Sequence, residues 1–340
     1  MIKKIVSYNL LVFFILIIVL ELSFGYWFDP ENFGIHMRKH RNINEFYNIT
    51  INDNNYKFEY KRNFYGFRDS KNEELGKIKY VFLGGSTGNE RFLPQKLSIV
   101  GRLNSLFDKK KSTVKIVNAS VDGKTSKGHI NDFNFWFPKL KNFNPNYFLV
   151  YVGINDAVLN QDEKYDLTFD DNFFKNSRDY LTNNSVLIEI IKKFKWRYLK
   201  STTLKYEINK TADLYENFFY IDYEKAKKIH DLKFLKLKHK NLYERYKDRI
   251  AKLSKEILNK KSTIIFITQV KYNGLKDEKL FLLNETLKEF SVKNNIDIIK
   301  LDESFKGSKN DFYDKVHTTE QGSHKIAILI YDRLKSLIDL

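Results

Sequence analysis

Two kinds of hydrophobic pattern alternate along most of the chain. Short runs rich in β-branched and aromatic residues predict buried strands at residues 79–83, 114–118, 147–152, 263–268 and 296–301. Amphipathic stretches with the period of a helix separate these runs, which is typical of strands that share one parallel sheet. We therefore predict an α/β fold. Its centre is a doubly wound, five-stranded parallel sheet in the flavodoxin-like order 2-1-3-4-5, with helices on both faces.

The amino-terminal segment has a different pattern, a nearly uninterrupted apolar run over residues 5–20. If Glu21 is tolerated near the interface, the run extends to about 24 residues, which is enough to span a bilayer. Lys3 and Lys4 precede the run, and such positive residues place an amino terminus in the cytoplasm. We expect the first 28 residues to be a transmembrane signal anchor that crosses the cytoplasmic membrane once, with the rest on the periplasmic or extracellular side. Cleavage after Gly25, which ends a small-x-small pattern, is the alternative.

The remaining chain divides into two parts. Residues 29–76 mix aromatic residues, asparagines and short alternating runs, which predicts a juxtamembrane neck with some β-structure. Residues 77–340 form the main domain. A stretch from about residue 160 to 259 interrupts the rhythm of this domain and predicts a helical insertion rich in Lys, Tyr and Phe.

The insertion carries two helical patterns. Residues 186–199 place apolar residues on one helix face and basic residues elsewhere. We expect this helix to be a lid packed on the sheet, and a helix that lies on a membrane surface is the alternative. Residues 223–258 predict one or two long charged helices with a solvated face.

Composition limits the possible classes of function. The 340 residues, 42% of them hydrophobic, are sufficient for one sizeable core. The formal net charge is +17, but there is no zinc-ligand spacing, RNP-like motif or long basic tail, so we expect no nucleic-acid partner. Cysteine is absent, which excludes disulfides, thiol catalysis and thiolate metal sites. The seven histidines form no metal-binding motif and no cofactor motif is present, so we expect neither a metal nor a cofactor.

Ser86 follows the first predicted strand of the main domain, in the segment V-F-L-G-G-S-T-G. Gly84 and Gly85 allow a sharp turn from strand to helix that displays the serine. On its own this segment can be an ordinary Gly-Ser turn. A serine hydroxyl becomes a nucleophile only where a histidine can take its proton and an acidic group orients that histidine.

Asp314 and His317 supply such a pair, three residues apart in F-Y-D-K-V-H-T-T, just before a predicted helix. The spacing allows the carboxylate to reach one ring nitrogen while the other ring nitrogen faces the serine. His324 is the nearest competing histidine, and Asp311 is a possible substitute for the acid. The alternative to a site is a surface loop in which both residues are solvated.

Gly123 and Asn155 follow the second and third predicted strands, in V-N-A-S-V-D-G-K-T-S and Y-V-G-I-N-D. Ligands bind open α/β folds at the carboxyl ends of the strands, so we expect both residues to lie near Ser86. There they can donate hydrogen bonds to an oxyanion. The alternatives are a plain glycine turn and an Asx turn, respectively.

Together the four segments resemble the sequence blocks of the SGNH hydrolase superfamily, also called GDSL-like esterases, over residues 78–338. The likeness is most specific between residues 115 and 157, which are similar to the branch that contains bacterial periplasmic thioesterase/lysophospholipases. The resemblance implies Ser86 as the nucleophile, His317 as the base and Asp314 as its orienting acid. It also implies an oxyanion hole formed by the amides of Ser86 and Gly123 and the side chain of Asn155.

The sequence departs from the family pattern most in the long stretch between the third and last blocks, which leaves the choice of substrate open. It also departs at one position of the first block and agrees with some members at others. The usual G-D-S reads Gly84-Gly85-Ser86 here, but the replaced aspartate is not a triad member. A G-G-S-T variant is familiar among membrane-anchored members. So is an upstream N-x-x-G-F-R segment, which residues 63–68 resemble.

The resemblance implies an exported, membrane-anchored serine esterase that acts through an acyl-enzyme. O-acetyl esters of cell-envelope carbohydrate are the expected substrates, as small molecules or as polysaccharide. The same triad can serve an O-acyltransferase, a lipase or a thioesterase, and these are alternatives. A non-catalytic envelope scaffold or binding protein is the alternative from another class. The sequence indicates no particular protein partner.

Overall fold

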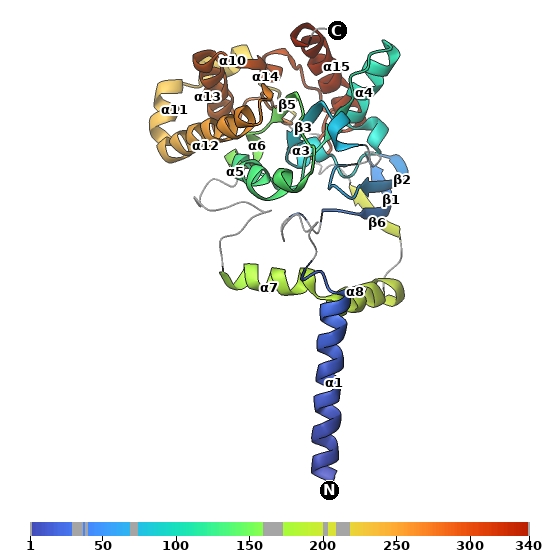
Figure 1. Ribbon diagram of the computed structural model, residues 1–340. Helices are drawn as coiled ribbons and strands as arrows, with labels where there is room; N and C mark the ends of the chain where they lie inside the picture. Colours follow the sequence, from blue (N-terminus) through green and yellow to red (C-terminus); the bar gives the residue numbers. More distant parts are fainter. Residues whose placement is uncertain are drawn as a thin grey trace.

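A parallel five-stranded sheet forms the centre of the molecule (Figure 1). The computed structural model describes residues 2–28, 37, 40–68, 74–158, 173–199, 203–208 and 218–338. The strands are β3 (Tyr80–Gly84), β4 (Ile116–Asn118), β5 (Tyr147–Tyr151), β7 (Thr263–Ile267) and β8 (Asp297–Ile299). They lie in the order β4-β3-β5-β7-β8, and every neighbouring pair is parallel. The predicted α/β class and the strand order 2-1-3-4-5 are therefore confirmed.

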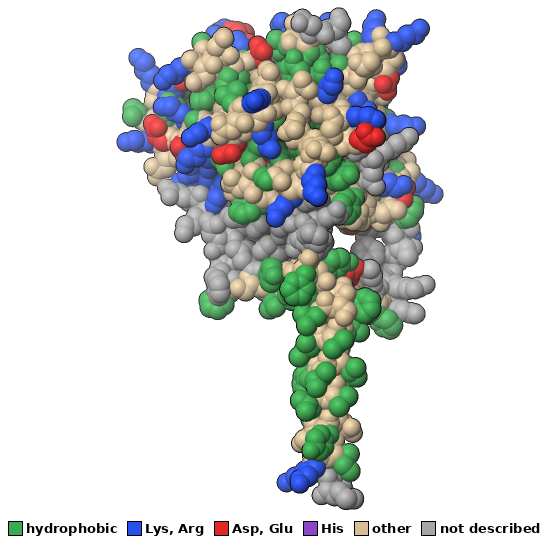
Figure 2. Space-filling view, viewed as in Figure 1, with side chains coloured by type: hydrophobic (Ala, Val, Ile, Leu, Met, Phe, Trp, Pro, Cys, Tyr) green, Lys and Arg blue, Asp and Glu red, His purple; other side chains and the backbone are tan. Residues whose placement is uncertain are grey.

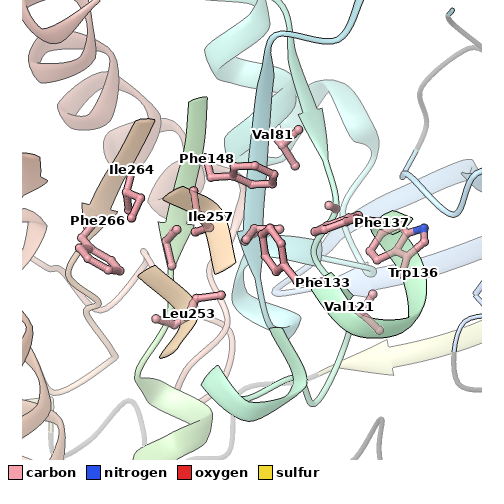
Figure 3. Close-up of a cluster of buried hydrophobic side chains, with 14 of the residues drawn as sticks. Val81, Val121, Phe133, Trp136, Phe137, Phe148, Leu253, Ile257, Ile264 and Phe266 are labelled. Atoms are coloured by element: carbon pink, nitrogen blue, oxygen red, sulfur yellow. The ribbon is translucent and has the colours of Figure 1, made fainter. Parts of the chain in front are cut away.

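Successive strand residues point to opposite faces of this sheet, as the pleat requires. Val81, Phe148 and Phe266 belong to one core, and the residues next to them in sequence belong to the other. The helices α5 (Ser126–Asn131), α12 (Lys240–Asn259) and α13 (Glu278–Asn294) cover the first face; α4 (Ile99–Lys109) and α15 (Glu320–Leu337) cover the second. Figure 3 shows the first core, where aromatic residues from 133 to 137 pack beside Val81 and Phe148. Burial of each such side chain contributes about 1.5–3 kcal/mol to the free energy of unfolding.

Shorter helices fill the connections. Near the strands these are η1 (Leu75–Lys77), α3 (Ser86–Asn89), η2 (Gln95–Leu97), η3 (Asp132–Trp136), η4 (Phe137–Lys139), α6 (Ile154–Val158) and α14 (Leu301–Ser304). In the insertion, α10 (Tyr223–Ile229) and α11 (Leu232–Lys238) precede α12. The region predicted as one or two helices is thus three. The side chains of Asp222 and Asp231 accept hydrogen bonds from the first turns of α10 and α11, so each begins a new helix.

A second, three-stranded sheet packs beside the main domain. Strands β1 (Ile43–Ile51) and β2 (Asn54–Arg62) form an antiparallel hairpin, and β6 (Thr203–Ile208) pairs with β1 in parallel. The turn residues Asn52 and Asp53 both have positive φ, 48° and 68°, as in the turns that match the strand twist. The buried face of the hairpin, which includes Tyr47 and Tyr60, packs against Leu93 and Tyr313 of the main domain. The strand within the insertion was not predicted from the sequence.

The amino-terminal helix α1 (Ile2–Phe24) projects from the rest of the molecule (Figure 1). An 18-residue window within its segment Lys3–Phe24 has a mean hydropathy of 2.6 and is not buried, so α1 can cross a membrane by length and composition. Figure 2 shows apolar side chains along α1, with basic side chains near its free end.

Helices α7 (Phe173–Asn184) and α8 (Val186–Leu199) lie across the carboxyl-terminal end of α1 (Figure 1). Among the described residues, α8 contacts α1 and α7, while its Ile190, Ile191 and Phe194 are exposed. The prediction of a lid packed on the sheet is therefore wrong. An amphipathic pattern identifies the apolar face of a helix, but it does not identify what covers that face.

Candidate active site

Ser86 lies at the turn between β3 and α3, as the sequence predicted. The strand ends at Gly84, Gly85 is the residue before the helix, and Ser86 is its first residue. A Cβ atom at Gly85 would lie 2.3 Å from Asn155 Nδ2. Only glycine at this position therefore lets the Asn155 amide approach the turn that carries Ser86.

His317 connects Ser86 to Asp314. The distance from His317 Nε2 to Ser86 Oγ is 2.8 Å, and that from His317 Nδ1 to Asp314 Oδ2 is 2.7 Å. The other carboxylate oxygen, Asp314 Oδ1, accepts from the amides of Val316 at 2.8 Å and His317 at 2.6 Å, which fixes the acid within its own loop. The ring of Tyr313 stacks on the imidazole with 5.7 Å between ring centroids. Such a relay can take the proton of a serine hydroxyl and hold the resulting imidazolium.

The electrostatic surroundings favour the charged pair. Burial alone lowers the pKa of His317, but the Asp314 carboxylate, together with Asp122 and Glu90, outweighs burial and raises this pKa above its ordinary value. Burial alone raises the pKa of Asp314, but hydrogen bonds from His317 and Val316 outweigh it and lower this pKa. His317 is therefore a stronger base than a free histidine, and a larger share of it is protonated at a given pH.

Asp122 offers a test of this electrostatic account. The base must be neutral to accept a proton, so kcat/KM should rise with pH through the pKa of His317. Changing Asp122 to Asn removes a negative charge that stabilises the imidazolium, so this pKa should fall. We expect the acidic limb of the kcat/KM profile of Asp122→Asn to move to lower pH. In the matched variant Asp332→Asn, which changes an exposed residue of α15, the limb should stay in place. A limb that is unchanged or moves to higher pH in Asp122→Asn would contradict the account.

The predicted oxyanion-hole residues lie on the loops after β3, β4 and β5. Asn155 is in the first turn of α6, and its Nδ2 donates to the carbonyl oxygen of Lys124 at 2.8 Å. This bond ties the turn after β5 to the loop that carries Gly123. Gly123 has φ +77°, a left-handed conformation that glycine adopts readily and that lets the loop turn at this residue. Because an amide nitrogen carries two hydrogens, Asn155 retains a second donor beyond the bond to Lys124.

Glu90 connects the segment that carries Ser86 to the loop that carries His317. Its role was not predicted from the sequence. Its buried carboxylate accepts from the Ile99 amide at 2.5 Å, from Thr318 Oγ at 2.7 Å and from Ser323 Oγ at 2.5 Å. Thr318 is the residue after His317. Glu90 therefore acts as a positioning residue that holds the imidazole at its distance from the serine.

Replacing Glu90 by Gln should weaken this connection, because an amide group places a donor against groups that already donate. We expect a loss of about 1–3 kcal/mol in the free energy of unfolding. We also expect a lower kcat under conditions where the variant is fully folded. Urea titration and steady-state kinetics measure the two effects. Glu289→Gln, which changes an exposed carboxylate on α13, is the control and should alter neither. Wild-type stability and kcat in Glu90→Gln would contradict the assigned role.

Gln269 is a second residue that the sequence reasoning missed. Its Nε2 donates to Thr87 Oγ at 3.1 Å, while its Oε1 accepts from the Ile154 amide at 2.6 Å. It thereby joins the serine helix to the turn that carries Asn155. Gln269 comes two residues after β7, so its place at the carboxyl end of a predicted strand was the available signal.

Two buried arginines of the neck, Arg62 and Arg68, support the segments that follow α3 and β4. Arg68 donates to the carbonyl oxygens of Leu93 at 2.6 Å and of Asn89, and Arg62 Nη1 donates to that of Ser120 at 2.8 Å. Both guanidinium groups are buried, and Arg68 ends the segment that resembles membrane-anchored SGNH members. The neck therefore contributes directly to the support of the serine loop.

His324 and Asp311, the alternatives to His317 and Asp314 that the sequence offered, lie outside this relay. His324 is exposed on α15. The carboxylate of Asp311 accepts from the amide and hydroxyl of Ser308 and pairs with Lys325 at 2.8 Å, so it is engaged within its own loop and with α15. Among the described residues, the structure thus brings together Ser86, His317 and Asp314.

Comparisons with known proteins give similarities of fold. No family model matches the sequence, and no curated protein matches it. A lipase/acylhydrolase from Enterococcus faecalis aligns with a TM-score of 0.45 at 13% identity, over 76% of this chain and 97% of that one. A variant of an acetyl xylan esterase from Geobacillus stearothermophilus gives 0.44 at 12%, over 76% and 96%. A member of the lipolytic protein G-D-S-L family from Veillonella parvula gives 0.42 at 13%, over 75% and 97%. Similarities at these identities concern the fold alone.

Proposed function

We propose that this protein is a serine ester hydrolase of SGNH type. The observation that supports it most directly is the relay in which His317 lies 2.8 Å from Ser86 Oγ and 2.7 Å from Asp314. Ser86 attacks the ester carbonyl while His317 Nε2 takes its proton, and Asp314 stabilises the imidazolium. The same proton then passes to the leaving alcohol, which departs and leaves an acyl group on Ser86.

Water then hydrolyses the acyl-enzyme, with His317 again serving first as base and then as acid. His317 takes a proton from water, the hydroxide attacks the acyl-enzyme, and the proton returns to Ser86 as the carboxylic acid leaves. In both steps negative charge develops on the carbonyl oxygen. The amides of Ser86 and Gly123 and the second Nδ2 hydrogen of Asn155 are the proposed donors to that oxygen.

The substrates we propose are O-acetyl esters of cell-envelope carbohydrate. Charged and polar groups lie beside Gly123: Asn89 Nδ2 donates to Asp122 at 2.7 Å, and Arg91 lies 3.8 Å from the same carboxylate and 2.6 Å from Glu45. Such groups suit the hydroxyls of a sugar better than a long acyl chain. The resemblance of the sequence to anchored SGNH members supports the same class.

We also propose that α1 anchors the enzyme in the cytoplasmic membrane with the catalytic domain outside. The apolar segment Lys3–Phe24 supports the anchor, and Lys3 and Lys4 at its start support this orientation.

A panel of esters tests the proposed activity. The full chain in detergent should hydrolyse p-nitrophenyl acetate and release acetate from O-acetylated oligosaccharides, and the Ser86→Ala chain should do neither. Faster cleavage of octanoyl or palmitoyl esters would favour the lipase or thioesterase alternative. Acetyl transfer to an added sugar, rather than to water, would favour the acyltransferase. No turnover of any ester by a folded wild-type chain would contradict the proposal.

A further inference from the structure

We propose that the helix pair α7–α8 lies on the outer surface of the lipid bilayer, where α1 leaves it. We refer to residues 173–199 as the platform. This inference rests on the anchor in the proposed function and adds a second, separate contact with lipid. It is independent of the ester chemistry.

The platform is attached to the end of α1 by a side chain from within the apolar helix. The Glu21 carboxylate accepts from Ser185 Oγ at 2.6 Å and from the amides of Leu187 at 3.1 Å and Val186 at 3.2 Å. These amides belong to the first turn of α8, where backbone N–H groups lack partners within the helix. Glu21 therefore caps α8. This capping role explains why an acidic residue occurs near the end of the otherwise apolar α1.

Two more contacts hold the corner between α7 and α8 beside the carboxyl-terminal end of α1. The amide of Tyr26 donates to the carbonyl oxygen of Asn184 at 2.9 Å. The ring of Trp27 meets that of Tyr180 edge-on at 5.8 Å. Trp and Tyr side chains are typical of the boundary between the acyl chains and the headgroups. The corner is thus held where the span of α1 ends.

The platform presents apolar side chains that are largely exposed. The exposed fractions are 82% for Phe174, 64% for Ile191 and 62% for Phe194, and Tyr180, Leu181 and Ile190 are exposed too. Figure 2 shows apolar side chains at the level where α1 meets the platform. Since α1 fixes the level of the platform at the membrane boundary, the lipid surface is the partner that reaches this face. The segment 192–197 also contributes four Lys or Arg residues to the sequence, which suits anionic headgroups.

The platform is linked to the catalytic domain through the small sheet. Strand β6 follows α8 in the chain and pairs with β1, and Figure 1 places this sheet between the platform and the main domain. On β1, Tyr47 packs in the same cluster as Tyr313, whose ring stacks on His317. A platform on the bilayer would therefore hold the site at a set height above the membrane.

Depth-dependent fluorescence quenching tests the proposal. The chain has no cysteine, so single cysteines can be introduced at Ile191, Phe194, Phe13 and Val292 and labelled with an environment-sensitive dye. Phe13 lies in the middle of α1, and Val292 is exposed on α13 of the catalytic domain. Each labelled full-length chain is reconstituted in vesicles of phosphatidylcholine and phosphatidylglycerol. These vesicles carry nitroxide lipids labelled either near the headgroup or deep in the acyl chain.

We expect the labels at 191 and 194 to lose more fluorescence to the shallow nitroxide, because interfacial helices bury their apolar face about 5–10 Å deep. The label at 13 should lose more to the deep nitroxide, and the label at 292 should respond to neither. A deep response at 13 without any response at 191 and 194 would overturn the platform and leave the anchor intact. No response at 13 would overturn the anchor itself. The vesicles hold no other protein, so quenching cannot come from a protein partner.

Discussion

Replacing Ser86 by alanine is expected to reduce kcat for ester hydrolysis by about 10⁴-fold or more. The change removes the atom that forms the acyl-enzyme and the hydroxyl that lies 2.8 Å from His317 Nε2. Ser86 lies at a partly exposed turn, so the loss of one oxygen leaves no core cavity and the fold should be retained.

The measurements are initial rates with p-nitrophenyl acetate and a thermal unfolding curve. A matched control is Ser336→Ala, which removes an exposed hydroxyl near the end of α15 and should change neither. A well-folded Ser86→Ala chain that keeps most of its activity would exclude Ser86 as the nucleophile.

Replacing Asn155 by alanine should lower kcat by about 10²–10³-fold with a modest effect on KM. The donor matters most after negative charge has formed on the substrate oxygen, so transition-state binding suffers more than substrate binding. The change also removes the bond from Nδ2 to the Lys124 carbonyl, which lies next to Gly123. Two of the three proposed donors are therefore affected together. Steady-state kinetics on a short-chain ester measure the effect.

The neighbouring residue provides a contrast within the same turn. The buried carboxylate of Asp156 accepts from the Ser126 amide at 3.0 Å and from Ser126 Oγ at 2.5 Å, and Arg249 lies 3.5 Å away. Asp156→Ala should therefore destabilise the fold by about 3 kcal/mol, since it removes the acceptor of the buried Ser126 donors and the carboxylate beside Arg249. The protein that stays folded should turn over at nearly the wild-type rate. If Asn155→Ala were fully active and folded Asp156→Ala inactive, the placement of the oxyanion donor would be wrong.

Much of the main sheet and of the site could be predicted because both depend on local sequence. Each strand is a short apolar run, and burial of both faces leaves the run without polar interruptions. Ser86 and Asn155 each follow such a run directly, and parallel strands bring their carboxyl ends to one edge. Asp314 and His317 pair within a single loop, so their spacing alone was informative.

The remaining features depend on contacts between distant segments. Glu90 receives donors from residues 99, 318 and 323, and nothing near Glu90 in the sequence indicates them. Strand β6 has a partner about 150 residues earlier in the chain, so its pairing with β1 has no local signal. The pattern of α8 favoured a lid because it identifies an apolar face but not the partner of that face. The bonds of α8 to Glu21 hold it at the end of α1, and no local pattern in the sequence indicates them.

Labelling with a fluorophosphonate probe, followed by peptide mass spectrometry, tests the central claim most directly. The probe forms a stable bond only with an activated serine hydroxyl, so it reports the relay without knowledge of the natural ester. We predict a single adduct on Ser86 in the folded full-length chain, strongly slowed labelling in His317→Ala, and none in Ser86→Ala. A folded wild-type chain that remains unlabelled, or an adduct on another serine, would contradict the proposed catalytic relay.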